Sequence, residues 1–152
     1  MSRNIQSVRN IELIEEELNS SIAGIVSFLS KEEKIIQIAL TFIYFDKNIY
    51  ISLQNEEELS EKINFEIKAN FALLKNTSVK QNKSKKTKDV YKFFSVNIIG
   101  KMRKVDDQKL IEEFQRQYLL KYSLEEKEDK DIKKNVYIID TEEIQAFEET
   151  GN

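Results

Sequence analysis

The stretch from Lys34 to Leu74 constrains the fold most, because it contains three apolar segments with a tight connection between the first two. Ile35–Phe45 is predicted to be a long strand, Asp46-Lys47-Asn48 its turn and Ile49–Gln54 the returning strand. After a charged helix, Asn70–Lys75 is predicted to be another strand. Strands linked by short turns favour antiparallel pairing. The chain is therefore expected to build an antiparallel sheet.

The rest of the chain adds helices and further strands to this hairpin. Apolar residues recur at helical spacing in Ile5–Leu18, in Glu56–Ala69 and in the segment after Asp106, which is a suitable N-cap residue. A brief turn is predicted near Thr141. Further strands are predicted at Ser21–Leu29, Val90–Val105 and Val136–Ile139. Gly100 interrupts the longest of them, which indicates a β-bulge or a close backbone approach.

These elements predict a single domain over residues 1–152, mainly β with peripheral helices (α+β). Residues 1–20 would form an N-terminal helical region, and the charged segments 78–89 and 123–134 would be mobile loops. Six antiparallel strands are expected to close, or nearly close, into a barrel. Closure would hide strand edges that a chain without proline does little else to protect.

Composition excludes several kinds of chemistry. The sequence has no Cys and no His, which excludes thiolate catalysis, Ser-His-Asp hydrolysis and the usual zinc sites. With only three glycines, a glycine-rich dinucleotide loop or P-loop cannot form. We find no carboxylate pair placed for acid–base work, so no catalytic side chain is predicted. Any redox or group-transfer chemistry would need a bound cofactor.

Charge and hydropathy indicate the compartment and the partners. The net charge of −3 gives no general case for nucleic-acid binding. No apolar run reaches the roughly 18–20 residues that span a bilayer, so no membrane partner is expected. The polar first ten residues lack the apolar core of a signal peptide. We therefore expect a cytoplasmic protein.

Ser60-Glu61-Lys62 stands at the predicted start of the charged helix. Helix N-termini present unpaired N–H groups and a partial positive charge, and a hydroxyl and an ammonium add further donors. This end of the helix could therefore hold a phosphate. Equally, Ser60 could be a plain helix cap and Lys62 a solvated helix lysine.

Three motifs, in this order and spacing, resemble the pyridoxamine 5'-phosphate oxidase-like family of FMN-binding split β-barrels. The first is the Phe42–Gln54 hairpin followed by the Ser60-x-Lys62 motif. The second is Lys68–Leu74, similar to the family's N-P-x-V-x-L segment with Phe71 in place of proline. The third is Ser95–Lys101, followed by an acidic pair, similar to the family's V-x-V-x-G-x-A strand.

The resemblance implies a six-stranded antiparallel split β-barrel and a homodimer with FMN at the subunit interface. Ser60 and Lys62 would meet the FMN phosphate, with Ser52 beside them. Ser95 would contact the flavin, often from the partner subunit in such proteins. The Gln37–Thr41 strand would run along the isoalloxazine ring. The implied activity is a flavin-dependent oxidoreductase acting on a small molecule that the sequence does not identify.

The sequence also departs from that family. Many members carry an Arg on the strand equivalent to Gln37–Thr41, and this strand has no Arg or Lys between Lys34 and Lys47. The C-terminal Trp and Arg of the true oxidase are absent, as is its substrate-binding His. These differences argue against the vitamin B6 oxidase reaction itself.

Two alternatives remain open from the sequence. One is a non-catalytic split barrel that binds a flavin or haem, although the absence of His argues against ordinary axial haem ligation. The other is a dimeric interaction module that uses the lysine-rich Lys80–Lys88 loop to contact an anionic partner. A solvated loop is the simpler interpretation of those lysines.

Overall fold

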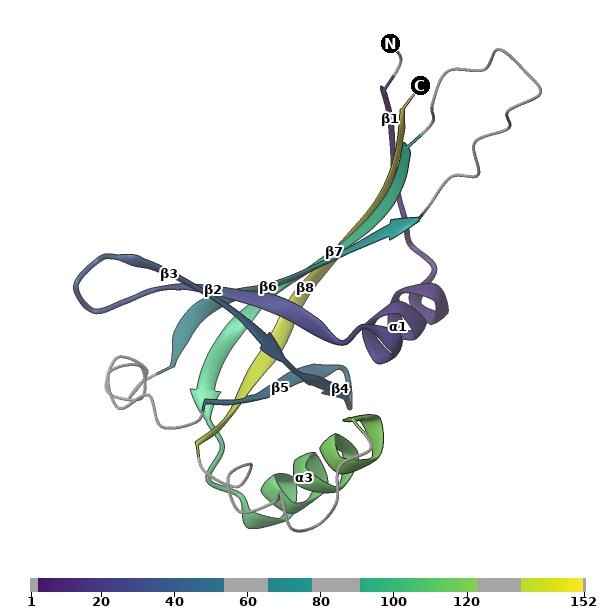
Figure 1. Cartoon of the computed structure of the whole chain (residues 1–152). Helices are drawn as coiled ribbons and strands as arrows, with labels where there is room; N and C mark the ends of the chain where they lie inside the picture. The colour runs from purple at the N-terminus through teal and green to yellow at the C-terminus, as the bar shows by residue number, and fades with distance from the viewer. Residues whose placement is uncertain (1–2, 54–65, 78–90, 123–134, 152) are drawn as a thin grey trace.

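The computed structural model describes residues 3–53, 66–77, 91–122 and 135–151. These residues form an eight-stranded sheet and two helices (Figure 1). All of the strand pairs are antiparallel. The strands are β1 (Arg3–Ser7), β2 (Ala23–Leu29), β3 (Ile35–Thr41), β4 (Ile43–Phe45), β5 (Asn48–Ser52), β6 (Ile67–Thr77), β7 (Tyr91–Lys104) and β8 (Val136–Gly151). The helices are α1 (Ile11–Ser20) and α3 (Gln108–Tyr122).

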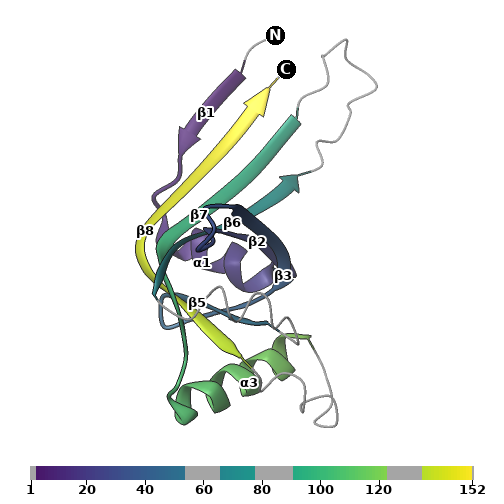
Figure 2. The same cartoon turned by 90° about the vertical axis from the view of Figure 1, so that its left-hand side faces the viewer.

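The sheet curls into a half-barrel. Its strand order is β3-β2-β6-β7-β8-β5-β4, and β1 pairs with β8 outside this path. The two end strands, β3 and β4, follow each other in the chain with only Phe42 between them. Figure 2 shows the long strands β7 and β8 curving from the helical end into an arm, where β1 lies beside β8. The predicted antiparallel β fold with peripheral helices is confirmed.

Eight strands are present among the described residues where six were expected. One addition is β1, which falls in the segment predicted to be helical. The other arises because Phe42 divides the predicted Ile35–Phe45 strand into β3 and β4. The side chain of Phe42 is fully buried against the ring of Phe71, so the bend anchors the strand in the core.

The main core fills the concave side of the sheet. Every second residue of each strand points inward, as the period of two requires. In β2, for example, Val26 and Phe28 are buried while Ile25 and Leu29 are exposed. Helix α1 covers part of this core through Ile14 and Leu18. Two aromatic residues of the hairpin, Phe42 and Tyr44, are also buried in this core.

A second core lies on the opposite, outward side of the sheet, beneath α3. Outward residues of β4, β5 and β8 pack there against the apolar stripe of the helix. That stripe was predicted from the sequence, and Phe114 at its centre is fully buried. The sheet contributes Ile43, Tyr50, Val136 and Ile138. We call this part of the outward side the covered face.

Two local predictions of backbone geometry are confirmed. Asp46 and Lys47 both have positive φ, near 50° and 64°, and join the paired residues Phe45 and Asn48. This two-residue turn fits the twist of a β-hairpin, and Asn48, predicted to be its third residue, is the first residue of β5. At the second place, the register of β7 against β8 shifts between Ile99 and Gly100. A side chain at Gly100 would clash with the backbone carbonyl of Asp140, which explains the glycine.

Four sequence predictions are wrong in their boundaries. Helix α1 begins at Ile11, not Ile5, because the side chain of Asn10 caps the N–H groups of Glu12 and Leu13. Strand β6 begins at Ile67, inside the predicted Glu56–Ala69 helix, whose residues 56–65 lie outside the described part.

At the C-terminal helix and strand, the predictions also need correction. Asp107 rather than Asp106 caps α3, since its carboxylate accepts from the N–H of Lys109 at 2.9 Å. Strand β8 continues past Ile139 to Gly151, where a brief turn was predicted near Thr141. Pairing with β7 on one side and β1 on the other overrides the weak strand propensity of this Glu-rich segment.

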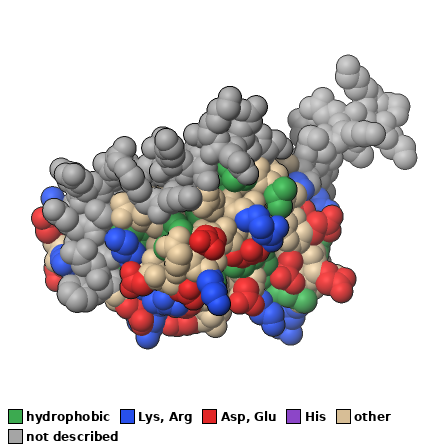
Figure 3. Space-filling model, turned by 90° about the horizontal axis from the view of Figure 1, so that it is seen from below, with side chains coloured by type: hydrophobic (Ala, Val, Ile, Leu, Met, Phe, Trp, Pro, Cys, Tyr) green, Lys and Arg blue, Asp and Glu red, His purple; other side chains and the backbone are tan. Residues whose placement is uncertain are grey.

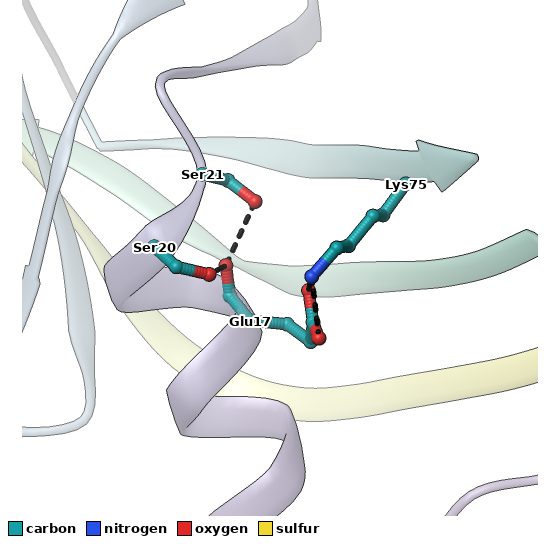
Figure 4. A network of polar contacts seen from close by, with 4 residues as sticks. All are labelled: Glu17, Ser20, Ser21 and Lys75. Carbon is teal, nitrogen blue, oxygen red and sulfur yellow. Dashed lines mark hydrogen bonds and ion pairs between the residues drawn. The ribbon is translucent and has the colours of Figure 1, made fainter. Parts of the chain in front are cut away.

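An ion pair ties α1 to the sheet (Figure 4). The ammonium of Lys75 in β6 lies 2.8 Å from Oε2 of Glu17 and donates to Oε1 at 3.0 Å. The hydroxyl of Ser21 donates to the backbone carbonyl of Glu17 at 2.7 Å, and the hydroxyl of Ser20 donates to it more weakly. These serines satisfy a carbonyl at the open end of the helix.

Candidate functional site

The outward side of the sheet away from α3 is uncovered by the described residues, and we call it the open face. It consists of the outward residues of β2, β3, β6, β7 and the adjoining part of β8. Large apolar side chains stand exposed on it: Ile25 (46% exposed), Leu29 (54%), Ile35 (77%) and Leu74 (63%). Apolar side chains grouped in this way mark binding surfaces more often than isolated ones do.

A polar stripe crosses the open face. Gln37 pairs with Ser27 and donates to its hydroxyl at 3.2 Å, and Ser27 pairs in turn with Asn70. Asn70 donates to Asn97 at 3.4 Å, and Asn97 pairs with Gln145. Each of five neighbouring strands thus contributes one amide or hydroxyl side chain.

Part of this stripe lines a groove of about 520 Å³, together with Lys68 and Ile99. The Oδ1 atom of Asn70 is buried there without a hydrogen-bond partner in the described structure. Buried polar atoms are normally paired, because an unpaired one loses its hydration without compensation. The groove therefore has a hydrogen-bond acceptor available for a ligand or another chain.

Two of the four sequence-predicted site residues lie in the described structure, and both are half-buried. Ser52 ends β5 and pairs with Val136 near the start of β8. Ser95 lies within β7, on the open face, and pairs with Phe147 near the end of β8. The other two residues, Ser60 and Lys62, lie outside the described residues.

The structure does not bring Ser52 and Ser95 together within one chain. Their partners on β8, positions 136 and 147, are eleven residues apart. That separation is on the order of 30 Å along an extended strand, longer than an FMN molecule. Both serines can contact one flavin only if a second copy of the chain supplies one of them.

Strand β3, the predicted neighbour of the isoalloxazine ring, is an edge strand of the sheet. It pairs with β2 along one side, and no other described strand pairs with it. The backbone N–H and C=O groups on its free side could hydrogen-bond the polar edge of a flavin, which carries alternating acceptors and a donor. Since edge strands usually need a cover, a ligand or partner here also fits the fold.

Helix α3 fixes the end of β3, a feature that the sequence did not predict. The hydroxyls of Thr41 and Tyr118 are 2.7 Å apart. The hydroxyl of Tyr122 accepts from the N–H of Phe42 at 3.1 Å and donates to the carbonyl of Ile22 at 2.7 Å. Burial raises the pKa of Tyr122 to about 12, so it stays a neutral donor. Tyrosines in an amphipathic helix resemble ordinary core residues in sequence.

The surface at the α3 end carries mixed charge. Figure 3 shows acidic and basic side chains interspersed with small hydrophobic areas on this side. Among the described residues, no three acidic side chains are grouped as a metal site, and no helix is long and apolar enough to cross a membrane. The cytoplasmic location remains a prediction.

Comparison with known proteins rests on structure, because no protein-family model matches the sequence and no curated protein matches it significantly. A candidate 5-nitroimidazole antibiotic resistance protein from Bacteroides thetaiotaomicron is similar over 100% of this chain and 93% of its own, with a TM-score of 0.75 and 13% identity. The fold is the split β-barrel of the pyridoxamine 5'-phosphate oxidase-like proteins.

Other split barrels support the same assignment. An FAD-binding protein from Mycobacterium smegmatis is similar over 94% of this chain and 97% of its own, with a TM-score of 0.62 and 12% identity. A candidate pyridoxamine 5'-phosphate oxidase from Corynebacterium glutamicum is similar over 95% of this chain and 98% of its own, with a TM-score of 0.60 and 18% identity. At these identities the likeness establishes the split-barrel fold.

Proposed function

We propose that this split barrel is a flavin-binding homodimer and that FMN binds where the free edge of β3 meets a second copy of the chain. The observation that carries the proposal is the separation of Ser52 and Ser95, which lie too far apart along β8 to serve one site in one chain. The flavin-binding proteins with the same fold support the choice of ligand.

The open face supports the choice of a second copy as partner. Exposed apolar residues flank its polar stripe, and the stripe includes the unpaired acceptor of Asn70. Two copies packed through this face would bury Ile25 and Leu74 and could pair the amides of the stripe. Such a surface, apolar with a few polar groups, is typical of protein–protein interfaces.

The residues present suit a flavin in chemical terms. The free edge of β3 offers backbone hydrogen bonds to the ring, and Ser52 offers a hydroxyl from the same copy. Ser95 would come from the partner copy. Ser60 and Lys62 are proposed to hold the phosphate. Bound FMN would supply hydride transfer at its N5 atom, and the chain would act as an oxidoreductase by orienting the ring and excluding water.

The proposal is tested by titrating the purified full chain with FMN, FAD and riboflavin and following flavin fluorescence. We expect one FMN per protomer and weaker binding of riboflavin, which lacks the phosphate. Lys62→Ala should weaken FMN binding by about 1–3 kcal/mol and leave riboflavin binding unchanged. Lys47→Ala, in the exposed hairpin turn, is the matched control.

Two results would count against this function. A chain that takes up none of the three flavins is not a flavin protein. If that chain still dimerises and binds nucleic acid in a salt-sensitive way, the interaction module becomes the better assignment. If FMN binds but Lys62→Ala has no effect, flavin binding stands and Lys62 is removed from the site.

A further inference from the structure

A separate cavity of about 440 Å³ lies between α3, β4 and the end of α1. Its volume is in the range of small-molecule pockets. The wall combines apolar side chains with amides and two cations: Asn19, Ile43, Tyr44, Arg116, Gln117, Leu120 and Lys121. None of these residues belongs to the open face or to the proposed flavin contacts.

Lys121 carries a positive charge that no carboxylate balances in the described structure. Its ammonium donates to the backbone carbonyl of Phe42 at 3.1 Å and lies 3.9 Å from the centre of the Phe42 ring. No described Asp or Glu lies within ion-pair distance of it. Burial lowers the pKa of Lys121 to about 8, because the ammonium loses water without gaining a negative partner.

The other charged groups around the cavity are already paired. Both guanidinium contacts of Arg116 go to Glu113, which also accepts from Gln117 at 2.9 Å. On the opposite wall the hydroxyl of Tyr44 donates to Glu15 at 3.0 Å. Among the described residues of this wall, Lys121 is thus the charge without a carboxylate partner, and its ammonium has three N–H groups, of which one donates to Phe42.

We infer that this cavity binds a small carboxylate with an apolar body, and that Lys121 is the residue that takes the carboxylate. The anion would replace the hydration that the ammonium has lost. Ile43, Leu120 and the ring of Tyr44 would pack against the apolar body. The amide of Asn19 at the end of α1 would orient it. The inference does not depend on flavin binding.

Benzoate and benzamide are the probes, because they have the same shape and differ in charge. Each is titrated into the full chain by calorimetry, with and without saturating FMN. Benzoate should bind saturably and at least 10-fold more tightly than benzamide in both cases. Lys121→Met should remove that preference, whereas Lys121→Arg should keep it. Lys109→Met, on the exposed surface of the same helix, should change nothing.

A second variant keeps the test decisive if Lys121→Met does not fold. Leu120 is 69% exposed at the rim of the cavity, so its replacement should not affect folding. Leu120→Glu places a negative charge beside the proposed carboxylate and should weaken benzoate at least 10-fold. Leu120→Gln, the neutral control, should weaken benzoate and benzamide equally.

The pH dependence gives an independent readout. Among the described residues, the titratable and charged groups on or next to the cavity wall, besides Lys121, are Glu15 on α1, Tyr44 on β4, and Glu113, Arg116, Tyr118 and Tyr122 on α3. Burial raises the pKa of Tyr44 to about 12, and that of Tyr122 likewise. The hydrogen bonds from Arg116 and Gln117 lower the pKa of Glu113 to about 2. Between about pH 7 and pH 9 the protonation states of these three groups therefore do not change: the two tyrosines stay neutral and Glu113 stays ionised.

Only the protonated form of Lys121 attracts the anion, so benzoate affinity should fall across that pH range. Benzamide affinity should stay constant. Benzamide binding as tight as benzoate binding would overturn the inference. The inference would also be overturned if benzoate affinity were the same in wild-type protein and in Lys121→Met, and did not fall as the pH rises. If Lys121→Met does not fold, Leu120→Glu takes its place in this comparison.

Discussion

The covered and open faces lie on the same outward side of one sheet but differ in what lies over them. On the covered face, Tyr50 and Ile138 are buried beneath α3 at 2% exposure each. On the open face, apolar residues in equivalent outward positions are half to three-quarters exposed, as with Ile25 and Ile35. The alternating strand pattern alone therefore does not decide burial. Burial depends on whether another element packs there.

The β-bulge at Gly100 lies at the border between the two faces. Beyond it toward α3, Lys101 and Arg103 point outward and form ion pairs with Glu66 and Asp140. On the other side, Ile99 and Asn97 line the groove of the open face. A bulge increases local twist and bends the strand pair. One long strand can therefore serve two differently covered surfaces.

The largest expected effect tests whether α3 holds the covered face. Phe114→Ala removes a fully buried ring from the second core and should reduce the free energy of unfolding by about 3–5 kcal/mol. Leu120→Ala, exposed on the same helix, should change it by less than about 0.5 kcal/mol. Urea unfolding measures both. Equal, small losses would mean that α3 contributes little to the fold.

The next effect tests whether the open face is an interface. The double substitution Ile25→Glu, Leu74→Glu places charges on the proposed dimer contact and should weaken dimerisation at least 100-fold, about 3 kcal/mol. Both residues are exposed in the single chain, so the protomer itself should stay folded. Ile11→Glu, exposed on α1, is the control. Sedimentation that shows the same oligomer for all three proteins would rule out this interface.

A smaller effect is expected at the border of the two faces. Gly100→Ala forces the new methyl group against the backbone of Asp140 and should cost roughly 1–3 kcal/mol of stability. Lys101→Ala, the exposed neighbour, loses only a surface ion pair and should cost less than about 1 kcal/mol. Thermal unfolding compares the two, and equal stability of both variants would argue against the close approach at Gly100.

The smallest effect concerns the attachment of α1 to the concave side. Lys75 is 46% exposed and Glu17 is 14% exposed at the side chain. A double-mutant cycle through Lys75→Met and Glu17→Gln should give a coupling of about 0.2–1 kcal/mol that shrinks in high salt. A coupling that does not respond to salt would indicate a contact other than this ion pair.

Local signals in the sequence were sufficient for several elements. The strand β2, the turn at Asp46-Lys47, the apolar stripe of α3 and the bulge at Gly100 all have short-range causes, and all are confirmed. Strand β1 and the far half of β8 could not be predicted this way. Their polar residues are held in strand form by pairing with distant segments.

The candidate site was less accessible to sequence reasoning. The sequence marks Ser52 and Ser95 as strand serines, but only the register of β8 reveals how far apart they lie. The sequence gives no signal at Lys121, because a lysine in the last turn of a helix is normally solvated. Its position over Phe42 follows from the packing of α3 across the bend between β3 and β4.

The most direct test of the account is an FMN titration of the wild-type chain and of the Ile25→Glu, Leu74→Glu variant at equal protein concentration. The variant keeps β3, Ser52 and Lys62 but should lack the partner that supplies Ser95. We expect the dimeric wild-type protein to bind one FMN per protomer and the folded, monomeric variant to bind at least 10-fold more weakly. A monomeric variant that binds FMN as tightly as the wild type would contradict a flavin site built from two copies.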